Sequence, residues 1–507
     1  MLNKQYMKHK TLKTIRVTLA IIFFTLITLL FLDFTGALNM YLGWIAKIQF
    51  LPALLALNFG VVLVLVALTL IFGRIYCSVI CPLGIFQDIV AHIHSIRHKN
   101  RYHYHKEMKI LRYSVLVIFI IALVAGIGSL VALLAPYSSW GRMVQSLFQP
   151  IYIWINNFFA YIAQRMDSYA FYSQEVWIRS VSTFVIALIS FLVIGIIAWK
   201  TGRGYCNSVC PVGTILSFLS RFSLLKINID EDKCIHCDKC TKNCKASCIN
   251  GKENFVDYSR CVVCGDCQSV CPKDAINYSF KKKKTVAKLS TSAKENKVDE
   301  SKRAFLLSAT ALASATVFAQ DKKKVDGGLA VIEEKKQYER TTQIVPPGAK
   351  SIKNLQQHCT GCQLCVSKCP NDVLRPSTDL MHLMQPVMSF EKGACRVECT
   401  ACSSVCPTGA IQKISKEDKT AIQIGHAVWV KQNCVVVTDE HQCGNCARHC
   451  PSGAITMIPL HPDKDDTLMV PAVNENRCIG CGMCEYVCPS RPFAAIYVEG
   501  NAIHKTI

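Results

Sequence analysis

Residues 359–370 read CTGCQLCVSKCP, and the spacing of the cysteines in this stretch decides how the chain around it folds. A run of Cys-x2-Cys-x2-Cys-x3-Cys-Pro binds 4Fe-4S clusters, because three closely spaced thiolates hold one cluster and the fourth holds its neighbour. Each cubane has one iron at each corner, so a tight loop can cap three corners while a distant cysteine closes the last. A pair of runs is therefore the smallest unit that folds around its clusters.

The segment 226–280 contains one such pair. Its first run is Cys234, Cys237, Cys240 and Cys244, and its second is Cys261, Cys264, Cys267 and Cys271. Crossing the fourth cysteines predicts one cluster on Cys234, Cys237, Cys240 and Cys271 and another on Cys261, Cys264, Cys267 and Cys244. The first run is irregular, because Lys245 replaces the expected proline and Cys248 lies four residues beyond Cys244. The spacing favours Cys244 as the ligand, with Cys248 as its competitor.

The C-terminal segment, 340–500, contains four more runs, two of them with insertions. Crossing adjacent runs predicts clusters on four sets: Cys359, Cys362, Cys365 and Cys406; Cys395, Cys399, Cys402 and Cys369; Cys434, Cys443, Cys446 and Cys488; and Cys478, Cys481, Cys484 and Cys450. A nested arrangement, in which the first run pairs with the fourth and the second with the third, satisfies the same spacing. The sequence predicts the ligands and leaves these two arrangements open.

The six runs use 24 of the 29 cysteines and predict six 4Fe-4S clusters, with iron as the bound metal. A zinc site typically takes two well-separated cysteine pairs, and disulfides between cysteines this close would be strained. The sequence has no Gly-rich dinucleotide loop, nucleophile elbow or His-Glu metal helix. We therefore assign no catalytic residue and expect electrons to pass through the soluble segments.

The hydrophobic fraction of 51% indicates that part of the chain lies in a membrane. Four apolar stretches are long enough to cross a bilayer as helices: 17–35, 51–72, 113–135 and 178–199. Basic residues gather before the first stretch and in the loop between the second and third, so the positive-inside rule places the N-terminus and that loop in the cytoplasm. The formal net charge of +22 reflects this topology, and we expect no nucleic-acid binding.

The second and fourth apolar stretches each run into nearly the same sequence. Residues 73–84 read GRIYCSVICPLG and residues 202–213 read GRGYCNSVCPVG. Each half of the membrane domain is thus two helices followed by a Cys-x3-Cys-Pro motif on the cytoplasmic side. Convergence of Cys77, Cys81, Cys206 and Cys210 would create either a seventh iron-sulfur site or a redox-active set of thiols.

The stretch 281–300 is a basic linker rich in Lys, Ser and Thr. It leads into 301–319, which opens with SKRAFLL and is similar to a twin-arginine export signal in which Lys302 replaces the first arginine. This stretch is either a signal or fifth span that places 320–507 in the periplasm, or a linker helix in the cytoplasm. Cleavage after Ala319 is left open.

The predicted fold is a four-helix transmembrane domain with two bacterial-type α+β ferredoxin modules, one of them doubled to four clusters. The domain boundaries are 1–225 for the membrane domain, 226–280 for the two-cluster module and 340–500 for the four-cluster module. The protein is expected in a bacterial inner membrane, with its N-terminus and residues 200–300 in the cytoplasm.

These motifs resemble a known family. Residues 1–280 are similar to the NapH-type membrane subunit of a quinol dehydrogenase, and residues 300–507 are similar to its NapG or MauM-type ferredoxin partner. The chain looks like a fusion of the two. The resemblance implies that menaquinol or ubiquinol is oxidised and that electrons pass to a periplasmic reductase, of the nitrate-reductase type, or to a cytochrome. The sequence does not place the quinol site; the aromatic-rich connection 136–177, which carries Arg142 and Gln145, is only a candidate for it.

Two other functions use the same parts. A cytoplasmic iron-sulfur maturation or metal-handling protein would keep residues 320–507 inside the cell. Electron transfer in the reverse direction, from a cytoplasmic donor to quinone, would need no change in architecture. The sequence gives neither the terminal acceptor nor the direction of flow, so its status as an enzyme is open.

Overall fold

The computed structural model describes residues 2–97, 102–168, 170–280, 333–461 and 468–507. It divides into one compact unit, Met1–Lys281 with Lys336–Ile507, and a second, Lys282–Lys335. The predicted basic linker and the twin-arginine-like stretch at 301–319 lie outside the described residues.

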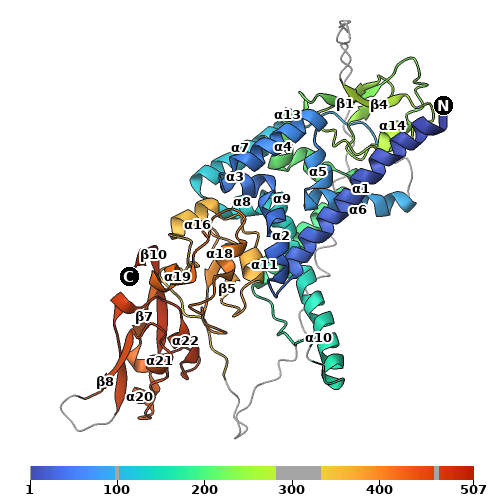
Figure 1. The fold of residues 1–507 in the computed structure, drawn as a ribbon. Helices are drawn as coiled ribbons and strands as arrows, with labels where there is room; N and C mark the ends of the chain where they lie inside the picture. The colour runs from blue at the N-terminus through green and yellow to red at the C-terminus, as the bar shows by residue number, and fades with distance from the viewer. Residues whose placement is uncertain (1, 98–101, 169, 281–332, 462–467) are drawn as a thin grey trace, which may run out of the picture. The chain divides into compact units, whose positions relative to one another are not determined.

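The described residues up to Ser220 form mainly helices (Figure 1). Their elements are α1 (Leu2–Leu32), α2 (Ala37–Lys47), α3 (Phe50–Leu55), α4 (Phe59–Phe72), α5 (Ile75–Val79), α6 (Pro82–Arg97), α7 (Lys109–Ala125), α8 (Gly128–Leu134), α9 (Pro136–Met143), η1 (Val144–Phe148), α10 (Gln149–Arg165), α11 (Val181–Thr201), α12 (Gly204–Ser208) and α13 (Pro211–Ser220).

Two of the four predicted spans are continuous helices long and apolar enough to cross a membrane, Lys13–Leu32 of α1 and Val181–Thr201 of α11. Only 28% and 22% of their most apolar windows are buried, so neither resembles the core helix of a soluble protein. The other two stretches are broken. Asn58 caps the start of α4, and Gly126 ends α7 in a left-handed conformation that favours glycine.

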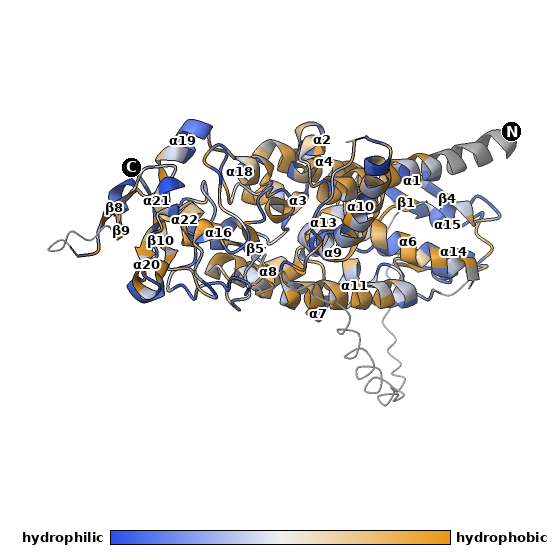
Figure 2. Ribbon diagram, turned by 90° about the horizontal axis from the view of Figure 1, so that it is seen from below, coloured by the Kyte–Doolittle hydropathy of each residue, from blue (hydrophilic) through white to orange (hydrophobic). Residues whose placement is uncertain are grey.

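The broken stretches still expose large apolar side chains. Phe59 and Leu63 on α4 are 73% and 69% exposed, and Ile110 on α7 is 86% exposed. In Figure 2, helices α7 and α11 are coloured mainly as hydrophobic. Apolar surface of this extent marks a face that contacts lipid or another protein.

The two-cluster module is small and rich in loops. Its elements are β1 (Leu225–Ile229), α14 (Lys239–Lys242), β2 (Ile249–Asn250), β3 (Phe255–Val256), α15 (Asp266–Ser269) and β4 (Ile276–Phe280). Strands β1 and β4 pair antiparallel, with Ile227 opposite Tyr278, and β2 pairs with β3. The paired terminal strands close the loops that carry the cysteines.

The four-cluster module repeats this plan and continues to Thr506, beyond the predicted boundary at residue 500. Its elements are α16 (Ile352–His358), α17 (Leu364–Ser367), β5 (Leu374–Pro376), β6 (Pro386–Met388), α18 (Ala401–Val405), α19 (Lys416–Ala421), β7 (Ile422–Trp429), η2 (Lys431–Asn433), α20 (Val435–Thr438), α21 (Asn445–Arg448), β8 (Ile455–Pro459), β9 (Met469–Val473), η3 (Glu475–Arg477), α22 (Met483–Val487) and β10 (Ile496–Thr506). The antiparallel pairs are β5 with β6, β7 with β10, and β8 with β9.

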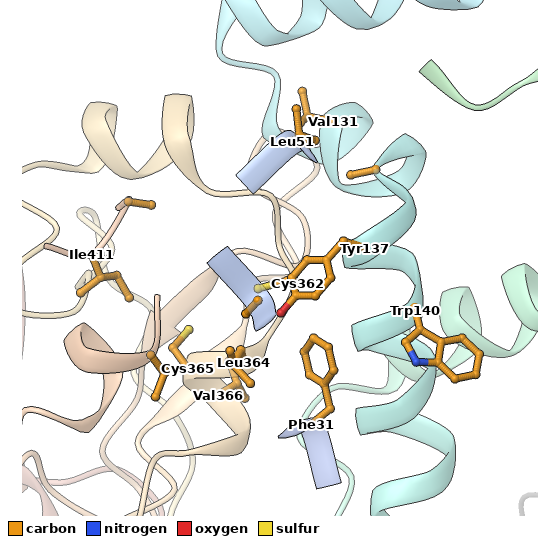
Figure 3. Close-up of a cluster of buried hydrophobic side chains, with 14 of the residues drawn as sticks. Phe31, Leu51, Val131, Tyr137, Trp140, Cys362, Leu364, Cys365, Val366 and Ile411 are labelled. Carbon is orange, nitrogen blue, oxygen red and sulfur yellow. The ribbon is translucent and has the colours of Figure 1, made fainter. Parts of the chain in front are cut away.

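The hydrophobic core is continuous from the N-terminal helices into the four-cluster module. Figure 3 shows Phe31 of α1 and Tyr137 of α9 beside Cys362 and Leu364. Lys368 in the same loop forms a buried ion pair with Asp33, at 2.5 Å, just beyond the C-terminal end of α1. The N-terminal half of α1 contacts the other module, because Lys13 pairs with Asp266 at 2.7 Å.

Candidate functional site

The four cysteines of the repeated motif are buried together. Cys77 and Cys206 lie in α5 and α12, and Cys81 and Cys210 immediately precede α6 and α13. Burial raises the pKa of Cys210, and negative charge on Cys206, Cys81 and Cys77 raises it further. The structure therefore brings the four thiols close enough to interact, as the repeat predicts.

The motif arginines lock the two halves together. The Arg74 guanidinium donates to the Cys206 carbonyl (3.2 Å) and to the Asn207 side chain (2.8 Å). In the opposite half, Arg203 donates to the Cys77 carbonyl (2.5 Å). Each arginine is fully buried and serves the backbone of the other motif. The two arginines occupy the same position in the two motifs. That repetition was the signal in the sequence for a shared structural role, but the prediction drew only on the cysteines.

The glycine that ends each motif lets the backbone pack closely. A Cβ atom at Gly84 would collide with the Cys77 carbonyl oxygen, and one at Gly213 with the Cys206 carbonyl oxygen. The collisions are with backbone, so a side chain at either position would displace a cysteine-bearing helix. The Cys-x3-Cys-Pro-x-Gly spacing thus fixes the thiols relative to one another.

Asp88 on α6 is the centre of a buried charge network. Arg203 binds both of its oxygens, at 2.7 and 2.6 Å, and Lys245 and Arg16 approach at 3.1 and 3.4 Å. Burial alone would raise the pKa of Asp88, but the charges of Arg203 and Lys245 outweigh it and hold that pKa well below its usual range. Lys245, the residue that replaces the expected proline, thereby attaches the two-cluster module to α6.

Replacing Asp88 with asparagine is expected to lower the free energy of unfolding by about 3–5 kcal/mol, because it leaves buried cations without their partner. The ionised carboxylate stabilises the fold above about pH 4, the ordinary aspartate pKa, and this stabilisation is lost as the pH falls below it. Thermal unfolding in detergent measures the effect. The exposed Asp232→Asn is the matched control, and equal midpoints for the two variants would contradict the role of Asp88.

The cysteines of the two-cluster module line two cavities. One is lined by Cys234, Cys237, Cys240 and Cys271. The other is lined by Cys244, Cys248, Cys261, Cys264 and Cys267. The Cys244 and Cys248 sulfur atoms are 3.5 Å apart and both are buried, so the structure places the two competing ligands at the same cavity.

The four-cluster module brings the fourth cysteine of each run beside the adjacent run. Cys406 lies near Cys362, Cys369 near Cys402, Cys488 near Cys446, and Cys450 near Cys478. In each pair, burial is the largest cause that raises the pKa of the thiol named second, and the negative charge of the thiolate named first raises it further. The pKa of Cys446 rises to about 11. Two cavities have these linings: Cys369, Cys395, Cys399 and Cys402; and Cys434, Cys443, Cys446 and Cys488. This geometry matches the adjacent arrangement rather than the nested one.

These sets fit a cubane better than a single metal ion. Among the described residues, no three His, Cys, Asp or Glu side chains converge closely enough to hold one ion. Four thiols around a cavity suit a cluster whose irons stand apart at its corners. Because burial raises the pKa of thiols such as Cys365, ionised ligands would require a positive partner, which the irons of a bound cluster would supply.

The first set of the four-cluster module faces the N-terminal helices. Arg142 of α9 donates to the Gly361 carbonyl at 3.4 Å, and the Tyr137 side chain points toward Cys362 (Figure 3). Within the module, the Cys395 amide donates to the Cys481 carbonyl at 3.0 Å, which makes the second and fourth sets neighbours. The helices α20, α21 and α22, which belong to the third and fourth sets, lie farther from the N-terminal helices than α18 does (Figure 1).

Comparison with known proteins agrees with this geometry. The chain is similar to the methylamine utilization ferredoxin-type protein MauM of Methylobacillus flagellatus, with 32% identity over 152 residues, 29% of this chain and 64% of that protein. It is also similar to the ferredoxin-type proteins NapG and NapF of Escherichia coli, at 29% and 25% identity, over 34% and 31% of this chain and 79% and 87% of those proteins. The chain is thus similar to ferredoxin-type proteins of the MauM and NapG kind. It spans about 64% of the length of the MauM relative.

The family matches fall on most of the cysteine-rich stretches of the chain. Residues 358–411 and 441–491 each match a 4Fe-4S dicluster domain, in agreement with the grouping of adjacent runs. A 4Fe-4S binding domain matches residues 255–277. Another family described as a 4Fe-4S binding domain matches residues 54–101 and 183–230, the two halves that carry the repeated motif. The protein is thus an iron-sulfur protein of the electron-transfer type.

Proposed function

We propose that this protein carries electrons from a membrane quinol to an acceptor beyond the outer face of the membrane. One observation carries the proposal: the two cysteine-rich modules contact α1 at positions far apart along its axis. Lys13 pairs with Asp266 of one module, and Asp33 pairs with Lys368 of the other. Twenty residues of helix span about 30 Å, the thickness of the hydrocarbon core of a bilayer.

This contact pattern supports the predicted topology. The two-cluster module would lie in the cytoplasm and the four-cluster module in the periplasm, with 301–319 as the fifth crossing. The apolar stretches 51–72 and 113–135 would complete a four-span domain through pairs of shorter helices. The acceptor would be a periplasmic reductase or cytochrome, since the sets lead away from the membrane helices.

The ligand sets for the six clusters are those of the crossed, adjacent arrangement. Cys77, Cys81, Cys206 and Cys210 would hold a seventh iron-sulfur site, because four buried thiols converge there and a 4Fe-4S binding family matches both halves. When bound, the clusters would supply one-electron transfer. The protein would set their reduction potentials through burial, charge and hydrogen bonds to sulfur. Gln87 provides such a bond, donating to Cys206 Sγ at 3.1 Å.

Menaquinol added anaerobically to the oxidised protein in liposomes is expected to reduce a substantial fraction of the clusters, because the proposed direction of flow runs from quinol to iron. The measurement is electron paramagnetic resonance of reduced clusters, with full reduction by dithionite as the reference and menaquinone as the control. Reduction of menaquinone by the dithionite-reduced protein, with no reduction by menaquinol, would establish the reverse direction. If the protein transferred electrons neither from menaquinol nor to menaquinone, a role in iron-sulfur maturation would be favoured.

A further inference from the structure

A cavity of about 270 Å³ lies where the outer connection of the membrane domain meets the four-cluster module. Its walls come from η1 and α10, the start of α11, the residue after Asp33, and the loop that carries Cys369. Its volume is near the lower end of ordinary small-molecule sites, about 300–1,000 Å³. It lies within the compact unit Met1–Lys281 with Lys336–Ile507.

Three buried glutamines line this space, which we call the glutamine cavity: Gln145, Gln149 and Gln363, with exposed fractions of 6%, 4% and 2%. Gln145 Oε1, Gln149 Nε2 and both polar side-chain atoms of Gln363 have no hydrogen-bond partner among the described residues. A buried polar atom without a partner costs about 1–3 kcal/mol, so three such residues around one space indicate a missing ligand.

The chemistry of the lining narrows the class of ligand. Glutamine amides both donate and accept hydrogen bonds, so they suit a molecule whose oxygens are carbonyls in one state and hydroxyls in another. Phe34, Ile153 and Phe184 supply apolar surface for a ring. Arg179, which pairs with Asp372 at 2.8 Å, has one further guanidinium nitrogen buried without a partner.

The position of the glutamine cavity favours a membrane quinol over a water-soluble ligand. Phe34 and Phe184 belong to the chain at the end of α1 and to the first turn of α11, the two helices able to cross a bilayer. Cys369 and Pro370, from a predicted cluster-binding run, form the opposite wall. A ligand in this cavity would therefore contact the ends of two long apolar helices and a predicted cluster ligand.

We propose that the glutamine cavity binds the head group of a membrane quinol, through hydrogen bonds from Gln145, Gln149 and Gln363. The inference rests on the proposed function and gives it a binding site. Gln145 belongs to the predicted connection 136–177. Arg142, the other residue singled out there, does not line the cavity and instead binds the Gly361 carbonyl and the Ser139 hydroxyl.

The test uses the full-length protein in detergent and 2-heptyl-4-hydroxyquinoline N-oxide, a quinol analogue whose fluorescence is quenched on binding. The double variant Gln145→Leu with Gln149→Leu is expected to weaken binding about tenfold or more, because each substitution removes a hydrogen bond from a buried site. Gln164→Leu, an exposed residue of the same connection, is the matched control. Iron content equal to that of the parent verifies that both variants fold.

Photolabelling of the parent protein with an azido-naphthoquinone gives a second readout that does not depend on activity. Label on peptides covering 145–153 or 172–184 supports the site. Unchanged affinity in the double variant, or label that maps only to other peptides, would overturn the site while leaving quinol-driven reduction of the clusters intact. Failure of the parent to bind either probe or to be reduced by menaquinol would overturn the proposed function as well.

Discussion

Anaerobically purified protein is expected to contain about 24 iron and about 24 acid-labile sulfide atoms per chain, because six sets of four thiolates each hold a cubane. A seventh cluster on Cys77, Cys81, Cys206 and Cys210 would raise each number to about 28. Changing Cys77 and Cys210 to alanine should then remove about four of each and leave the remainder in place. Stoichiometric zinc with little sulfide would refute the iron-sulfur assignment.

Single cysteine variants test the ligand sets by the same measurement. Cys271→Ala should perturb the cluster begun by Cys234 and leave the one begun by Cys261 largely intact, since the fourth ligand crosses over. At the cavity that both cysteines line, Cys244→Ala should cause a large loss of cluster iron and sulfide, and Cys248→Ala only a small one. The opposite ranking would make Cys248 the ligand.

Protease added to intact spheroplasts is expected to degrade the 320–507 segment completely, because the proposed topology places it outside the cytoplasmic membrane. Cluster insertion requires cytoplasmic machinery, so this module would have to cross already folded, the route that a twin-arginine signal serves. An antibody against the C-terminus follows the digestion on a blot.

The control for this topology experiment changes Lys302 and Arg303 to glutamine, which should block export and protect the segment. A cytoplasmic marker protein must remain intact throughout. Protection of the segment in both parent and control would reject a periplasmic electron donor and leave the cytoplasmic maturation role in place.

Cysteine spacing predicted much of the candidate site because it is a local property. The run at Cys359 needs only a tight loop, and its partner run follows within about fifty residues. The choice between Cys244 and Cys248 is different, since both sulfurs reach one cavity and the sequence pattern is irregular at Lys245. The structure explains that irregularity, because Lys245 pairs with Asp88 and Asp266.

The features that sequence reasoning missed depend on contacts between distant residues. Arg74 and Cys206 are 132 positions apart, and Gln363 lines the same cavity as Gln145 only because the connection 136–177 folds against the C-terminal module. The helix breaks also depend on context. Asn58 and Gly126 lie inside apolar stretches whose composition alone predicts unbroken spans.

The buried pair of Asp33 and Lys368 has a consequence for how the two halves of the chain are kept together. Because both modules belong to one polypeptide, docking of the C-terminal module is a unimolecular closure, and covalent linkage can hold the local concentration of a partner at about the millimolar level. Even a weak intrinsic affinity between the two surfaces around Asp33 and Lys368 is then sufficient to keep the C-terminal module docked nearly all of the time. A single cut between residues 281 and 332 would turn the same contact into a bimolecular equilibrium, in which dilution alone separates the two halves and opens the glutamine cavity.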